Sequence, residues 1–106
     1  MNDLQDFMDH IARVWKCDAH RYPELTKMTL EQRKNFLLKH SLLHINKTTG
    51  KIAALCEDFD HNGKLMKEEL NLSDLSIKMF INALNLAKEV GLSAKDLLSR
   101  GPTFLK

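Results

Sequence analysis

The chain has 106 residues, of which 43% are hydrophobic and 28% charged, and its formal net charge is +2 at pH 7. This length suits one domain, predicted over residues 1–106, and the composition excludes a disordered tail and a membrane-embedded protein. The small, evenly spread charge argues against nucleic acid as a partner. The acidic start lacks the order of a signal peptide, and no apolar run could span a bilayer, so we expect a cytoplasmic location.

Apolar residues recur at helical spacing near the N-terminus and predict a first helix over residues 3–16. Asn2 and Gln5 are placed as a capping pair ahead of it. Residues 17–28 contain Pro23 and many polar side chains, which indicates a connection with room for one helical turn.

Two cysteines, Cys17 and Cys56, lie far apart and form no CxxC pair. They fit buried reduced thiols better than a disulfide framework or a zinc site.

Two long helices are predicted next. Thr29 and Gln32 form a capping box, and no proline interrupts residues 29–59, which favours one continuous helix. The helical pattern resumes over residues 66–90 and stops at Gly91.

The C-terminal part is predicted to hold a short helix. Ser93 and Asp96 cap it, it ends before Gly101 and Pro102, and residues 103–106 form a tail. The predicted fold is therefore all-α, an antiparallel bundle of three main helices plus a short C-terminal helix.

The third helix is predicted to have one narrow polar stripe on an otherwise apolar surface. The stripe consists of Asp74, Lys78, Asn82, Asn85 and Glu89. The remaining apolar arc is too wide for one partner helix, which favours a homodimer or a dimer of dimers. The alternative is that the short helix and the connection cover this arc.

A basic strip is predicted on the second helix, where His40, His44, Lys47 and Lys51 follow at spacings that share one face. Such a strip can hold a phosphate or carboxylate. The alternative is a solvated face whose lysine stems cover apolar neighbours. His40 and His44 are spaced to share a metal ion, although no glutamate lies between them as in HExxH.

Residues 58–69 match the calcium-loop pattern DxDxNG followed by glutamate at the twelfth position. The oxygen ligands would be Asp58, Asp60, Asn62 and Glu69. No second loop accompanies it, and a turn rich in Asp, Asn and Gly between antiparallel helices would contain the same residues. Calcium binding by a single EF-hand-like loop is therefore an alternative hypothesis.

Residues 47–55 and 72–92 resemble the two long helices of the MazG-like all-α nucleotide pyrophosphohydrolases. The resemblance extends over roughly residues 30–98. It implies a helical, oligomeric fold and, in typical members, magnesium ions held by acidic clusters while a triphosphate is hydrolysed.

The acidic positions of that family fall here on Lys47, Thr48, Lys51, Asn71 and Asp74, of which Asp74 alone is acidic. Lysines where Mg²⁺ would lie argue against ordinary hydrolysis by this hydrolase family. A displaced metal site could be supplied by the carboxylates near the turn, which are Glu57, Asp58, Asp60, Glu68 and Glu69.

The leading hypothesis is therefore a protein that binds a nucleotide or another phosphorylated small molecule between the second and third helices. Its ligand-binding residues would be His44, Lys47, Lys51, Asn71, Asp74 and Lys78. A noncatalytic helical protein for oligomerisation or interaction is the remaining alternative.

Overall fold

The computed structural model describes the backbone of residues 3–62 and 65–105, and their side chains apart from 59, 62 and 65–70. The elements in chain order are α1 (Leu4–Val14), η1 (Pro23–Lys27), α2 (Leu30–Asn62), α3 (Leu65–Glu89), α4 (Ala94–Arg100) and η2 (Gly101–Phe104). The described part contains no strand, so the all-α prediction is confirmed. None of its helices is long and apolar enough to cross a membrane.

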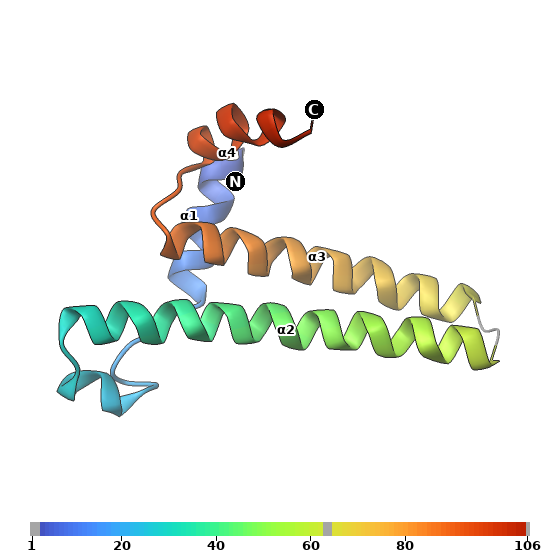
Figure 1. Cartoon of the computed structure of the whole chain (residues 1–106), viewed down its shortest axis with the longest axis horizontal. Coiled ribbons are helices and arrows are strands. Elements are labelled where there is room, and N and C mark those ends of the chain that lie inside the picture. Colours follow the sequence, from blue (N-terminus) through green and yellow to red (C-terminus); the bar gives the residue numbers. More distant parts are fainter. Residues whose placement is uncertain (1–2, 63–64, 106) are drawn as a thin grey trace.

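The molecule is built around a long antiparallel hairpin of α2 and α3 (Figure 1). The shorter α1 lies across one end of this hairpin, against α3, and α4 packs on α1 (Figure 1). The overall extents are 50 × 34 × 28 Å. The antiparallel part of the predicted bundle is therefore the α2–α3 pair, which α1 crosses.

The N-terminal cap of α1 differs from the predicted pair by one residue. Asp3 is the N-cap, and its Oδ1 accepts a hydrogen bond from the Asp6 amide at 2.8 Å. The predicted cap Asn2 lies outside the described residues. Gln5 joins two helices instead, because its Oε1 accepts a hydrogen bond from the Ala94 amide at 2.9 Å.

Both other predicted caps are confirmed. The Thr29 amide donates to Gln32 Oε1 at 2.9 Å, and the Gln32 amide donates to Thr29 Oγ1 at 3.1 Å. Ser93 and Asp96 form the equivalent reciprocal pair at the start of α4. The chain after α4 forms the short η2 helix in place of the predicted tail.

The apolar core is concentrated where α1 and α4 meet α3. It consists of Met8, Ile11, Leu84, Ala87 and Ala94. Further along the hairpin, Leu75 is the buried apolar residue among those described. Burial of apolar side chains therefore stabilises one end of the hairpin far more than the other.

Polar residues form the contact between α2 and α3 at the middle of the hairpin. Asn82 Nδ2 donates to Thr48 Oγ1 at 2.6 Å, and Asn85 Nδ2 donates to Ser41 Oγ at 3.1 Å. All four residues are buried. The middle of the predicted polar stripe thus faces α2.

Large apolar side chains of α3 and its C-cap are turned outward instead: Ile77, Phe80 and Val90 are at least half exposed.

The two cysteines have different surroundings. Both are free thiols, and Cys17 is partly buried while Cys56 is exposed. The prediction that both are buried is therefore wrong for Cys56. It lies on the side of α2 that also exposes Thr49, away from the buried Thr48.

Candidate functional site

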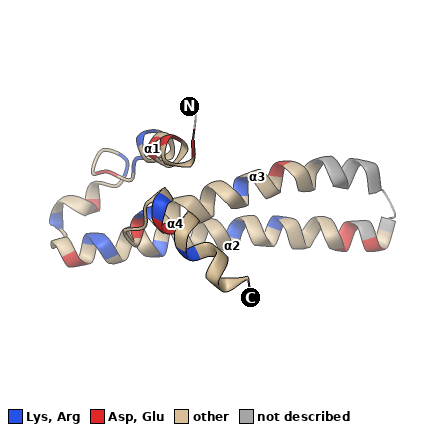
Figure 2. Ribbon diagram, turned by 90° about the horizontal axis from the view of Figure 1, so that it is seen from above, with Lys and Arg blue, Asp and Glu red and all other residues tan. Residues whose placement is uncertain are grey.

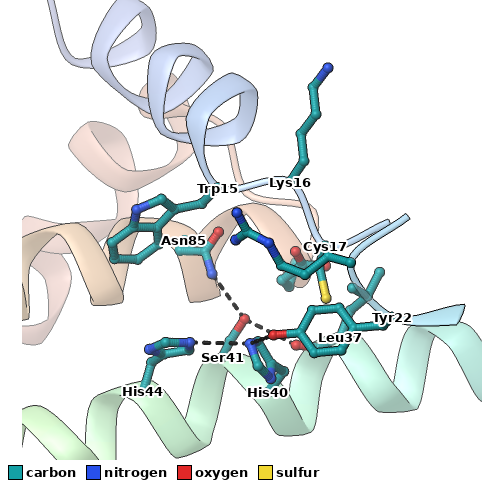
Figure 3. Close-up of a pocket in the computed structure, with 11 residues that line it drawn as sticks. Trp15, Lys16, Cys17, Tyr22, Leu37, His40, Ser41, His44 and Asn85 are labelled. Atoms are coloured by element: carbon teal, nitrogen blue, oxygen red, sulfur yellow. Dashed lines mark hydrogen bonds between the residues drawn. The ribbon is translucent and has the colours of Figure 1, made fainter. Parts of the chain in front are cut away.

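A cavity of about 170 Å³ lies between α2, α3 and the connection that follows α1 (Figure 3). The connection contributes Trp15, Lys16, Cys17, Arg21 and Tyr22, α2 contributes Leu37, His40, Ser41 and His44, and α3 contributes Asn85 and Glu89. This volume is similar to that of engineered cavities that hold one aromatic ring.

Two histidines and a tyrosine form a hydrogen-bonded chain on one wall of the cavity (Figure 3). His40 Nε2 lies 3.1 Å from His44 Nε2 and 3.1 Å from the Tyr22 hydroxyl. The two histidines are four residues apart, so one face of α2 presents both. Because an imidazole nitrogen carries either one N–H or one lone pair, one of the two Nε2 atoms donates to the other, which accepts.

Aromatic rings hold these imidazoles in place. The Trp15 ring stacks on His44 with centroids 5.8 Å apart. The Phe36 ring stacks on His40 at 6.0 Å, and Tyr22 meets both Phe36 and His40 edge to face. The three hydrogen-bonded side chains, Tyr22, His40 and His44, are therefore fixed by packing as well as by hydrogen bonds.

Asn85, one of the residues that line the cavity, has an unpaired acceptor. This residue is 9% exposed, and its Nδ2 is bound to Ser41 Oγ, which itself donates to the Leu37 carbonyl. Its Oδ1 is buried and has no hydrogen-bond partner among the described residues. Figure 3 shows this oxygen directed away from Ser41. A buried carbonyl without a donor is costly, so the cavity favours a molecule that donates a hydrogen bond to it.

The histidine and cysteine of the cavity are neutral, whereas its lining also includes charged side chains. Burial, followed by the nearby His40 and Lys47, lowers the pKa of His44 below its usual 6.5, so this imidazole is neutral at pH 7. Burial, followed by Glu89 and Asp18, raises the pKa of the Cys17 thiol above 9.0, which keeps it protonated. Lys16 and Arg21 are exposed at the rim, and the Glu89 carboxylate lies 3.2 Å from Lys88 Nζ.

A second, open groove brings together four of the predicted ligand-binding residues. Lys51 from α2 lines it with Asn71, Asp74 and Lys78 from α3, beside Ala54, Leu55 and Leu75. All four predicted residues are exposed. His44 belongs to the cavity instead, and Lys47 is exposed and lines neither depression.

The carboxylates proposed for a metal lie near the far end of α2. Figure 2 shows basic positions along the middle of α2 and acidic positions near the end that joins α3. Glu57, Asp58 and Asp60 are exposed there, and Glu57 lies 3.8 Å from His61. Within the described part, no three His, Cys, Asp or Glu side chains are grouped to hold a metal ion.

The calcium-loop hypothesis depends partly on residues whose side chains are not described. The side chains of Asn62 and Glu69 lie outside the described residues. Asp58 and Asp60 belong to the last turns of α2, which extends to Asn62. Residues two apart on a helix point in different directions, so shared coordination by these two aspartates requires this turn to unwind. Calcium and magnesium binding stay predictions.

Most of the cavity is absent from the sequence prediction, which includes only His44 among its ligand-binding residues. Trp15 belongs to the predicted first helix and Tyr22 to the predicted connection, and Asn85 belongs to a stripe whose direction the pattern leaves open. The available signal is the presence of the aromatic residues Trp15 and Tyr22 near a predicted connection.

Comparison with protein-family models, with curated proteins and with solved structures gives no match for this chain.

Proposed function

We propose that this protein binds a nucleotide or a similar phosphorylated ring compound, with the ring in the cavity and the phosphate at its rim. The unpaired, buried Oδ1 of Asn85, a residue that lines the cavity, is the observation that carries this proposal. A ring N–H or amino group of the ligand would donate the hydrogen bond that water donates to an amide oxygen exposed at a protein surface.

The shape and charge of the cavity favour this class of ligand. Trp15 and Tyr22 offer aromatic surfaces on which a planar ring packs. The exposed Lys16 and Arg21 supply cationic donors for phosphate oxygens at the mouth. Lys47 lies three residues beyond His44, so it follows on a neighbouring part of the same face of α2.

A MazG-like identity remains part of the proposal. It is supported by the antiparallel α2–α3 hairpin and by the groove that brings Lys51 next to Asn71 and Asp74. Lys51 and Lys78 accompany Asp74 in this groove, which disfavours a magnesium cage there. We therefore propose ligand binding in the cytoplasm and assign no hydrolytic reaction.

Calorimetry and thermal shift with the common nucleoside mono- and triphosphates, with and without magnesium, test the proposal. Asn85→Ala should weaken binding about tenfold, the equivalent of one buried hydrogen bond. Asn82→Ala is the matched control, because Asn82 is an equally buried amide on α3 outside the cavity. The nucleotide affinity of the control should change by less than about twofold, because Asn82 and the ligand share no interaction partner. Absence of any nucleotide response would refute the proposal.

We further propose that the chain forms a homodimer or a dimer of dimers through its exposed apolar surface. The chain exposes 8099 Å², whereas a compact monomer of 12.2 kDa exposes about 6,100 Å². Its radius of gyration is 16.7 Å, against about 13 Å for a compact domain of this length. The surplus exceeds the area of about 800 Å² that each partner buries in an ordinary interface.

Light scattering after size exclusion tests this assembly. The wild-type mass should be at least twice 12.2 kDa. Ile77→Glu should dissociate the assembly, because Ile77 is 56% exposed on α3, away from the apolar core. Leu105→Glu, at the exposed C-cap of η2, serves as the control and should leave the mass unchanged. A monomeric wild-type chain at all concentrations would refute assembly.

A further inference from the structure

We propose that His40 and His44 form a two-nitrogen binding site for a divalent late transition metal ion such as Zn²⁺. The Tyr22 hydroxyl, 3.1 Å from His40 Nε2, is an additional oxygen donor beside them. Both histidines also line the cavity proposed for the ring, but the metal site is argued from their own geometry and requires no bound nucleotide.

The distance between the two imidazoles fits a shared ion. Zinc binds histidine nitrogen at about 2.0–2.1 Å. Two such ligands at 90–110° around one ion lie about 2.9–3.4 Å apart, as follows from that bond length. The two Nε2 atoms are 3.1 Å apart. An ion can therefore replace the shared proton with little movement of either ring.

The surroundings hold both rings in the position that binding requires. Trp15 stacks on His44 and Phe36 stacks on His40, so neither imidazole needs to be ordered by the metal. Ligand rings that are already oriented bind metals more tightly than mobile ones.

The donor set determines the class of ion. Imidazole nitrogen suits zinc, copper and nickel, whereas calcium and magnesium require oxygen ligands. Two histidines with a nearby hydroxyl leave further coordination positions for water, which resembles an open site more than a closed structural one. The site differs in both residues and metal class from the carboxylates of residues 58–69.

Titration of the untagged chain with zinc chloride and with nickel chloride tests the site. Trp15 is the only tryptophan and stacks on His44, so Ni²⁺ bound there should quench its fluorescence. Calorimetry should give one Zn²⁺ per chain. His44→Gln and His40→Gln should each weaken Zn²⁺ binding at least tenfold, with the helical circular dichroism unchanged.

His61→Gln is the control, because His61 also has a potential ligand four residues away in Glu57 but is 72% exposed. It should bind Zn²⁺ as the wild type does. Absence of Zn²⁺ binding, or equal binding by wild type and His44→Gln, would overturn the metal site. Nucleotide binding measured in EDTA is expected to persist in the wild type, so failure of one proposal is distinguishable from failure of the other.

Discussion

Asn82 on α3 donates a hydrogen bond to Thr48 on α2 across 2.6 Å, in a part of the hairpin where both side chains are buried. The Asn85 and Ser41 pair repeats this contact about one turn away on α3 and two turns away on α2. A slide of α3 along α2 would separate both pairs at once and leave several buried polar groups without partners. The two amides therefore fix the register of the hairpin, a role that buried polar residues also have in coiled coils.

Removal of one partner of this pair should destabilise the protein. Asn82→Ala leaves the Thr48 hydroxyl buried without its donor, and the free energy of unfolding should fall by about 1–3 kcal/mol. Replacement of both residues, Asn82→Leu with Thr48→Val, should recover much of this loss because no unpaired group remains. Urea unfolding of Asn82→Leu, of Thr48→Val and of the double variant measures the coupling. Additive losses would contradict the role assigned to the hydrogen bond.

Two glycines should respond to alanine in opposite directions. Gly91 ends α3 with φ +83°, a left-handed conformation that costs an alanine about 1–2 kcal/mol. Gly50 lies within α2, and a methyl group added to its Cα would meet open space. Gly50→Ala should therefore stabilise the protein by about 0.5–1 kcal/mol through helix propensity. Thermal unfolding of the two variants should show Tm values on either side of the wild type.

Acid should destabilise the protein through His44. Its pKa is lowered in the folded chain, chiefly by burial, so the folded state favours the neutral imidazole. The resulting stability is complete above about pH 6.5, declines as the unfolded chain begins to bind the proton, and is fully lost below the folded pKa. Urea unfolding across this range should show a smaller pH dependence for His44→Gln than for the wild type. Equal dependence in both chains would assign the effect to other groups.

Thiol reagents should distinguish the two cysteines. Cys56 is exposed, whereas Cys17 is partly buried and its pKa is raised, first by burial and then by Glu89. Because the thiolate is the reactive form, Cys56 should be labelled at least tenfold faster at pH 8. Cys17→Ser and Cys56→Ser chains, labelled separately and identified by mass, give the two rates. Faster labelling of Cys17 would contradict the described cavity wall.

The helices and their ends follow closely from local sequence signals. Thr29 with Gln32 and Ser93 with Asp96 satisfy backbone donors within three residues, so no knowledge of the rest of the fold is needed to find them. The N-cap residue of α1 is harder to identify from sequence, because Asn2 and the neighbouring Asp3 both offer a side-chain oxygen that can accept the capping hydrogen bond. Residue type alone does not distinguish between adjacent capping residues.

The direction of the helix faces could not be predicted in the same way. Amphipathic patterning assumes that apolar residues face inward, whereas Asn82 and Asn85 face α2 and Ile77 faces outward. A polar stripe turns inward only when another helix offers partners at matching heights, and Ser41 and Thr48 supply them from more than thirty residues away. The cavity depends on the same long-range pairing, so Asn85 could not be assigned to it from sequence.

The position of α1 and α4 at one end of the hairpin implies that resistance to local opening is unequal along it. Backbone amides near Leu84 lie beneath the buried cluster and should exchange with solvent deuterium only when the whole chain unfolds. Those of residues 52–58 have no such cover within the described chain and should exchange by fraying of α2. If a second copy packs on the hairpin, this difference in exchange rate between its two ends should disappear as the protein concentration rises.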